Sequence, residues 1–184
     1  ADDVIGTLAE RARAAGHEVL IISSDKDFAQ LIGEQVKMWE TIRDVVYDRE
    51  LVQKKWGVYP EKFVDYLALL GDKVDNIPGV PGIGAKGAQQ LLEQYGSLQA
   101  MLEADVPGKN GKLLQEHKEQ ALLSQRLATI QTQVPLDIEL EALRLLPPDP
   151  LVLNELHRSL EFYSLLKDGA RSADAQAEEE RGGG

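Results

Sequence analysis

The 184-residue sequence contains no cysteine. This absence excludes disulfide bonds and metal sites built on thiolates, and it fits a reducing compartment. Long apolar runs are also missing, since none approaches the roughly 20 residues that a membrane-spanning helix needs. The first residues have neither the basic region nor the apolar core of a signal peptide. We therefore expect a cytoplasmic protein with no membrane partner.

Basic residues are scarce as well. Lys and Arg number 20 against 31 Asp and Glu, which gives a formal net charge of −11. A nucleic-acid-binding protein usually presents a basic footprint, because Lys and Arg make its phosphate contacts. Six aspartates that stand in three pairs carry −6 of this charge, and bound divalent cations would offset much of it. The acidic total therefore does not exclude a nucleic-acid partner.

These paired aspartates are the first sign of chemistry in the chain. The pairs are Asp2 and Asp3, Asp25 and Asp27, and Asp72 and Asp75. Hard divalent cations prefer oxygen ligands and tolerate several carboxylates around one pocket. Residues two apart in an extended chain point to the same side, so Asp25 and Asp27 could reach one pocket. Each pair also has a plain structural interpretation, as a helix cap or the start of a turn.

A glycine-rich turn follows the last pair. It runs Asn76-Ile77-Pro78-Gly79-Val80-Pro81-Gly82-Ile83-Gly84 between two expected helices, and Lys86 falls in the first turn of the second helix. This is the helix-hairpin-helix pattern. Gly82 and Gly84 let the backbone approach a phosphate closely, and Lys86 adds a positive charge. A simple connection between helices would need only one glycine, so the turn favours a grip on a nucleic-acid backbone.

The first third of the chain alternates helix and strand, which indicates an α/β fold. We expect a helix from Asp2 or Asp3, as its cap, to Gly16, a strand over 18–23 buried on both faces, short strands over 36–39 and 45–47, and a helix from Asp48 to Gly57. From Pro60 the pattern is mainly helical. We expect helices over 61–70, about 85–95 and from Ser97, a loop over 107–112 that leads into a long helix through Leu127, and a last helix after Asp149.

Four runs, taken in order, resemble the carboxyl-terminal part of the 5′ nuclease domain of bacterial DNA polymerase I, a member of the flap endonuclease family. They are Ala1-Asp2-Asp3-Val4-Ile5-Gly6, Asp25-Lys26-Asp27, the run from Leu69 to Gly84, and Leu127-Ala128-Thr129-Ile130. The resemblance covers about residues 1–166. It implies a partial PIN-like core over 1–59 and a mainly helical helix-hairpin-helix subdomain over 60–166. Residues 167–184 have nothing to bury and are expected to be a disordered tail or linker.

The resemblance also implies an activity, namely cleavage of DNA at a 5′ flap or 5′ end in replication and repair, with two Mg²⁺ or Mn²⁺ ions. Asp2 matches a ligand of the first ion, with Asp3 in the same cluster; Asp25, Asp27 and Asp72 match ligands of the second, and Asp75 an additional carboxylate beside it. Asp2, Asp25, Asp27 and Asp72 are thereby expected to be catalytic. Gly79, Val80, Pro81, Gly82, Ile83, Gly84 and Lys86 match the helix-hairpin-helix that grips the duplex, in which turn carbonyls often hold K⁺.

The sequence also departs from that family. The amino-terminal strand with its metal-binding aspartate and the basic helical arch have no counterpart here, so we expect a fragment that cleaves flap DNA poorly by itself. Two other functions stay open. One is a non-catalytic duplex-binding module that uses the helix-hairpin-helix alone, and the other is a Mg²⁺-dependent phosphatase of small substrates, which leaves the hairpin unexplained. The sequence does not decide whether a polymerase domain belongs to the parent chain, which we expect to act at the bacterial nucleoid.

Overall fold

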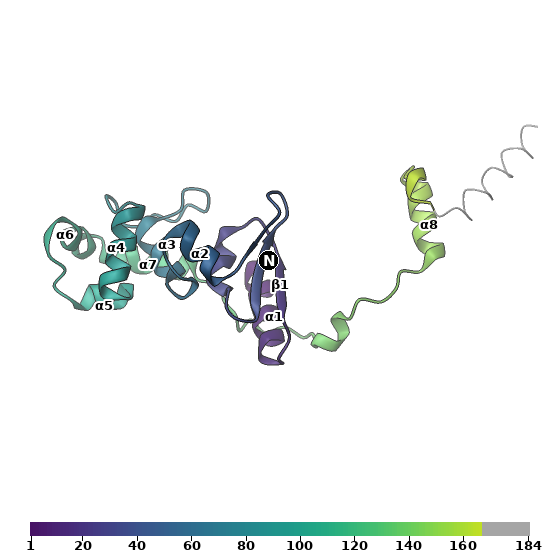
Figure 1. Cartoon of the computed structure of the whole chain (residues 1–184), viewed down its shortest axis with the longest axis horizontal. Coiled ribbons are helices and arrows are strands. Elements are labelled where there is room, and N and C mark those ends of the chain that lie inside the picture. The colour runs from purple at the N-terminus through teal and green to yellow at the C-terminus, as the bar shows by residue number, and fades with distance from the viewer. Residues whose placement is uncertain (167–184) are drawn as a thin grey trace, which may run out of the picture. The chain divides into compact units, whose positions relative to one another are not determined.

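The structure, a computed structural model, describes residues 1–166 (Figure 1). The chain divides into two compact units, Ala1–Leu140 and a second that begins at Glu141. The expected disordered tail over 167–184 lies outside the described residues. Within the part that the structure describes, none of the helices has both the length and the apolar character needed to cross a membrane.

The elements follow the alternating pattern and then the helical one. In chain order they are α1 (Asp2–Ala14), β1 (Val19–Ile22), the 3₁₀ helix η1 (Lys26–Leu31), β2 (Val36–Glu40), β3 (Val45–Tyr47), α2 (Arg49–Trp56), η2 (Pro60–Lys62), α3 (Phe63–Leu70), α4 (Ala85–Tyr95), α5 (Leu98–Glu103), α6 (Gly108–Glu116), α7 (Lys118–Ala128), η3 (Leu140–Leu143), α8 (Pro150–Ser159) and η4 (Tyr163–Leu165).

The sheet has three strands in the order β1-β2-β3. β1 pairs with β2 in parallel, and β2 pairs with β3 antiparallel. Our prediction that the first strand is buried on both faces was wrong. Ile21 is buried, but Leu20 and Ile22 are 51% and 63% exposed. An all-apolar strand is typical of a two-sided parallel sheet, but the residues that the structure describes bury only one face of this one.

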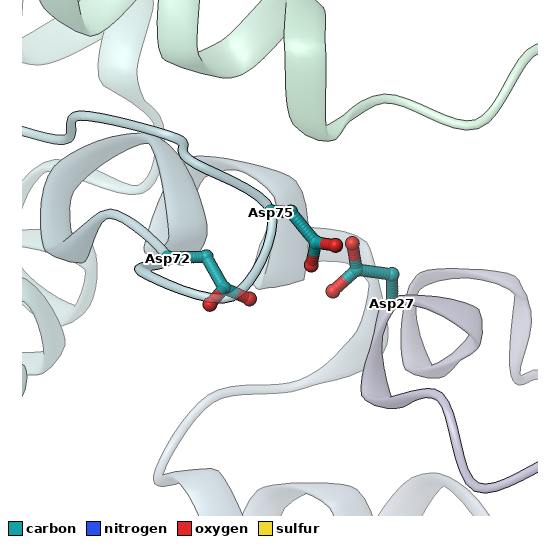
Figure 2. A group of neighbouring side chains, drawn as sticks. All are labelled: Asp27, Asp72 and Asp75. Carbon is teal, nitrogen blue, oxygen red and sulfur yellow. The ribbon is translucent and has the colours of Figure 1, made fainter.

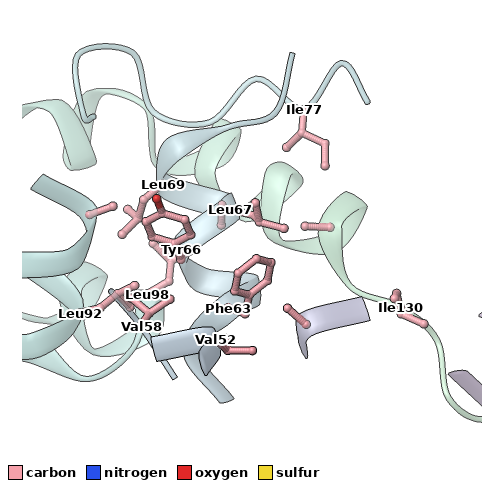
Figure 3. Close-up of a cluster of buried hydrophobic side chains, with 14 of the residues drawn as sticks. Val52, Val58, Phe63, Tyr66, Leu67, Leu69, Ile77, Leu92, Leu98 and Ile130 are labelled. Atoms are coloured by element: carbon pink, nitrogen blue, oxygen red, sulfur yellow. The ribbon is translucent and has the colours of Figure 1, made fainter. Parts of the chain in front are cut away.

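Helix α3 forms the centre of the helical part. Its sequence is apolar almost throughout, so it is buried on most sides rather than on one stripe. Figure 3 shows Phe63, Tyr66, Leu67 and Leu69 of this helix among apolar side chains from its neighbours. α3 packs against α4, α5 and α7. Gly71, at a φ of 78°, ends α3 and turns the chain into the loop that carries Asp72.

Two further predictions need correction. Residues 107–112 were expected to form a loop before one long helix, but α6 begins at Gly108 and a break at His117 separates it from α7. α6 forms because Leu114 is fully buried on its inner side, which outweighs the poor helix propensity of its glycines. The cap of α1 is Ala1, so Asp2 and Asp3 lie inside the first helical turn instead of capping it.

Candidate metal centre and nucleic-acid interface

Three of the six paired aspartates named above come together in space. One carboxylate oxygen from each of Asp27, Asp72 and Asp75 lies within 4.8 Å of the other two. Asp27 belongs to η1, directly after β1, whereas Asp72 and Asp75 lie in the loop after α3. Figure 2 shows the carboxylates of Asp27 and Asp75 pointing toward each other, with Asp72 beside them. Two regions that lie far apart in the sequence therefore build one acidic cluster.

The loop after α3 is closed tightly by its own backbone. The N–H of Asp72 donates to the carbonyl of Ile77 at 2.8 Å, and the N–H of Ile77 donates back to the carbonyl of Asp72 at 2.7 Å. One oxygen of the Asp72 carboxylate accepts from the N–H of Val74 at 2.9 Å. These bonds fix the direction in which the Asp72 side chain points, and its second oxygen accepts a hydrogen bond from Nζ of Lys26.

Asp27 is held from two sides. Its N–H donates to Oδ1 of Asp25 at 2.9 Å, so Asp25 caps η1. Its carbonyl accepts from Nε2 of Gln30 at 2.9 Å, and the same amide nitrogen donates to the carbonyl of Ala128 at 2.9 Å. Gln30 Oε1 in turn accepts from the N–H of Ile130. Gln30 thus ties η1 to the end of α7, a role that no sequence pattern indicated.

Lys26 is the member of the site that sequence reasoning missed. Its Nζ donates a hydrogen bond to Asp72 Oδ2, and it lies 3.5 Å from Asp27 Oδ1 and 4.0 Å from Asp75 Oδ2. A single ammonium group therefore contacts all three carboxylates of the cluster. The signal was present in the run Asp25-Lys26-Asp27, in which the lysine is one residue from an expected ligand.

The cluster divides its members by the ease with which they ionise. Burial raises the pKa of Asp27 to about 6, against an opposing effect of Lys26, and the nearby carboxylates of Asp25, Asp75 and Asp72 add to the rise. The pKa of Asp72 is lowered instead, because hydrogen bonds from Lys26 and from the Val74 N–H overcome its burial. Desolvation and the Asp72 charge raise the pKa of Asp75, although its side chain is exposed. The raised pKa values of Asp27 and Asp75 show that negative charge is crowded here, and a bound cation would relieve this crowding.

The donor set fits a hard divalent ion. All three side chains offer carboxylate oxygen, which Mg²⁺ and Mn²⁺ prefer. Among the described residues, the buried Oδ1 of Asp27 has no hydrogen-bond partner, and its ion pair with Lys26 is long, at 3.5 Å. A buried oxygen without a hydrogen bond is costly, and a metal ion is one way to satisfy it.

The other three aspartates lie outside this cluster. Asp25 is occupied at the cap of η1, and Asp2 and Asp3 are exposed in the first turn of α1. Oδ1 of Asp3 accepts from the N–H of Gln131 at 2.8 Å. Their predicted roles as metal ligands stay predictions.

The glycine-rich turn separates an inner side from an outer side. Val80 and Ile83 are 2% and 4% exposed and anchor the turn in the core, whereas Gly82, Gly84 and Lys86 are exposed. Gly84 is the N-terminal cap of α4. The N–H groups in the first turn of this helix therefore have no carbonyl within the helix to bond to. Helix α4 thus begins with unpaired N–H donors beside an exposed lysine, and these are the groups that a phosphate site uses.

Gly79 belongs to the inner side of the same turn. Its N–H donates to Oγ of Ser124 at 3.0 Å, and its carbonyl accepts from Nε2 of Gln120 at 2.9 Å. Ser124 is fully buried on α7. Both backbone groups of Gly79 are thus used within the protein. The roles predicted for Gly79, Val80, Pro81 and Ile83 in DNA binding stay predictions.

Comparison with known proteins covers both segments of the chain that contribute to these features. Residues 1–57 match the family model for a 5′-3′ exonuclease, N-terminal resolvase-like domain, and residues 58–151 match that for a 5′-3′ exonuclease, C-terminal SAM fold. The chain is 44% identical to DNA polymerase I of Pseudomonas aeruginosa, covering 97% of this chain and 21% of that protein. It is 41% identical to the 5′-3′ exonuclease of Aquifex aeolicus, covering 91% of this chain and 58% of that protein. The chain thus spans only part of these relatives.

Solved structures agree. A mutant of the phage T5 5′-exonuclease has a TM-score of 0.67 and 26% identity, with 72% of this chain and 56% of that chain covered. The same exonuclease with bound zinc ions has a TM-score of 0.66 and 25% identity, with 71% and 50% covered. The resemblance found in the sequence and the expected PIN-like α/β core with a helical subdomain are confirmed. The chain belongs to the 5′-3′ exonuclease family.

Proposed function

We propose that this chain provides the metal-binding and duplex-gripping parts of a 5′ nuclease that cuts DNA at a 5′ flap or 5′ end. The observation that carries the proposal is the cluster of Asp27, Asp72 and Asp75, drawn from the two regions that match the two halves of the family. A structural role alone does not account for a buried carboxylate oxygen that has no hydrogen-bond donor, has one lysine ammonium 3.5 Å away, and lies beside two further carboxylates.

In this proposal Asp27 and Asp72 hold a Mg²⁺ or Mn²⁺ ion, with Asp75 as an additional carboxylate. Asp25 accepts the N–H of Asp27 and thereby orients it, and we also keep Asp25 as a predicted ligand of this ion. Asp2 and Asp3 belong to the other metal position. Metal ions in such sites lower the pKa of an attacking water and stabilise charge on the scissile phosphate. The T5 5′-exonuclease with bound zinc supports a divalent ion in this fold. The choice of Mg²⁺ or Mn²⁺ for this chain follows from its donors, which are all oxygen atoms.

The outer side of the glycine-rich turn is proposed to hold the duplex. Gly82, Gly84 and Lys86 are exposed on one side, and the N–H groups that begin α4 add a partial positive charge. These groups can read phosphates but carry no information about base sequence. K⁺ held by turn carbonyls would fit this role. We propose further that the parent chain carries a polymerase domain and works at the bacterial nucleoid, as the polymerase I relatives suggest.

A flap-cleavage assay tests the proposal. The purified chain, in excess over a labelled 5′-flap DNA and with Mn²⁺, is expected to give a slow cut near the junction of flap and duplex. Asp72→Asn should give no product above background and should bind the duplex as the wild type does, because the turn is untouched. If neither protein cuts and both bind the duplex equally, the chain is the non-catalytic binding module instead.

Metal binding should depend on pH in a direction that the Asp27 carboxyl sets. Below its pKa of about 6 this carboxyl is mostly protonated, and the metal must displace the proton in order to bind. We expect the Mn²⁺ affinity to rise roughly tenfold per pH unit below about 6 and to level off above about 7. Titration calorimetry between about pH 5 and 8 measures this rise, and Asp27→Asn should flatten it. A wild-type affinity that is constant over the range contradicts the assignment.

A further inference from the structure

Lys26 occupies the place where the proposed metal would bind. Its ammonium group contacts Asp72, lies 3.5 Å from Asp27 Oδ1 and 4.0 Å from Asp75 Oδ2, and the carboxylate oxygens of these residues lie within 4.8 Å of one another. The ammonium thus neutralises part of the negative charge of the three carboxylates in a partly buried position. Its own side chain is 34% exposed, so solvent reaches it only in part.

An ammonium group and a divalent ion compete for this cluster. A metal ion binds carboxylate oxygen at about 2.0 to 2.6 Å, so an ion shared by the three carboxylates would lie close to the present position of Nζ. Two cations a few ångströms apart in a partly buried site repel each other strongly. The flexible four-carbon stem of lysine allows the ammonium to leave without a change of backbone.

We propose that Lys26 is a built-in counter-ion that the metal must displace, and that it thereby weakens metal binding and sets the affinity of the site. The inference rests on the proposed function, because it requires a divalent ion at the cluster. While the metal is absent, the lysine offsets the repulsion among the three aspartates. When the metal binds, the ammonium moves into solvent.

Lys73 provides a matched control for this role. It stands next to Asp72 in sequence as Lys26 stands next to Asp27, and it is exposed in the same loop as Asp72 and Asp75. Removal of either lysine changes the net charge by the same amount. A variant of Lys73 therefore measures the general effect of a lost positive charge, and a variant of Lys26 measures that effect plus the loss of the specific contacts.

The test is a calorimetric titration of Mn²⁺ into the wild-type chain, Lys26→Met, Lys73→Met and Asp72→Asn at one pH and salt concentration. We expect Lys26→Met to bind Mn²⁺ about tenfold more tightly than the wild type and Lys73→Met to differ by less than about twofold. Equal or weaker binding by Lys26→Met overturns the inference. If the wild type binds no Mn²⁺, or binds it as Asp72→Asn does, the metal site itself is wrong and the inference fails with it.

A second measurement needs no variant. Lysines of the wild-type chain are acetylated briefly with acetic anhydride, with and without saturating Mn²⁺, and the modified sites are quantified by mass spectrometry. Because displacement frees the ammonium, labelling of Lys26 should rise several-fold with Mn²⁺ while labelling of Lys73 stays constant. Unchanged labelling of Lys26 at saturating Mn²⁺ contradicts displacement.

Discussion

Gly79→Ala is expected to lower the free energy of unfolding by about 3 kcal/mol or more, because two separate penalties add. Gly79 has a φ of 63°, in the left-handed region that disfavours side chains. A Cβ at this position would also lie 2.4 Å from the backbone nitrogen and 2.6 Å from the Cα of Gly71. Backbone atoms cannot move aside as the end of a side chain can. The backbone segments at Gly71 and Gly79 would therefore have to separate.

Variants at two other glycines distinguish the conformational penalty from the steric one. Gly16 has a φ of 85°, but no heavy atom lies within 4 Å of the place its Cβ would take, so Gly16→Ala should cost only the conformational part, about 1 kcal/mol. Gly33 has neither feature, and Gly33→Ala should change the stability by less than about 1 kcal/mol. Urea denaturation of the three variants gives the comparison. Equal stability of Gly79→Ala and Gly33→Ala would show that the turn does not need to pass this close to Gly71.

Gly84→Val is expected to weaken duplex binding roughly tenfold while the fold stays intact, since a branched side chain would keep a phosphate away from the start of α4. Gly84 has an ordinary φ of −94°, and no heavy atom lies within 4 Å of where its Cβ would stand. The fold itself therefore has no need of glycine here. An external ligand that approaches the backbone would explain it.

Fluorescence anisotropy with two duplexes of unrelated sequence measures this effect. Both affinities should fall by a similar factor, because backbone N–H groups read phosphate only. Gly33→Val, at an open position outside the turn, is the matched control and should bind both duplexes as the wild type does. A loss confined to one duplex would point to base contacts, and no loss would remove the turn from the DNA interface.

Much of this arrangement follows from local sequence. The apolar run of β1, the cap Asp48 and the left-handed Gly57 each specify an element or its end, and the structure has β1 and α2 where a strand and a helix were predicted. The glycine-rich turn was also recognised, because its glycines are grouped within a few residues between two helical patterns. Patterns of this kind are complete within a short stretch of chain, so a sequence alone reveals them.

The parts that sequence reasoning missed depend on residues distant in the chain. Gln30 bridges to Ala128 and Ile130, and Ser124 supports Gly79 from a separate helix. Neither the periodicity nor the spacing of residues in the sequence indicates such pairs. The exposure of Leu20 and Ile22 was missed for a related reason, because an apolar strand does not reveal what covers each of its faces.

The central claim is that Asp27, Asp72 and Asp75 hold a divalent metal ion, and anomalous diffraction from a crystal soaked in Mn²⁺ tests it most directly. The account predicts an anomalous peak among the three carboxylates, at about 2.0 to 2.6 Å from the oxygens it binds, with the Lys26 side chain turned away. A well-ordered crystal with these carboxylates accessible, with Mn²⁺ bound elsewhere and Lys26 still paired with Asp72, would contradict it.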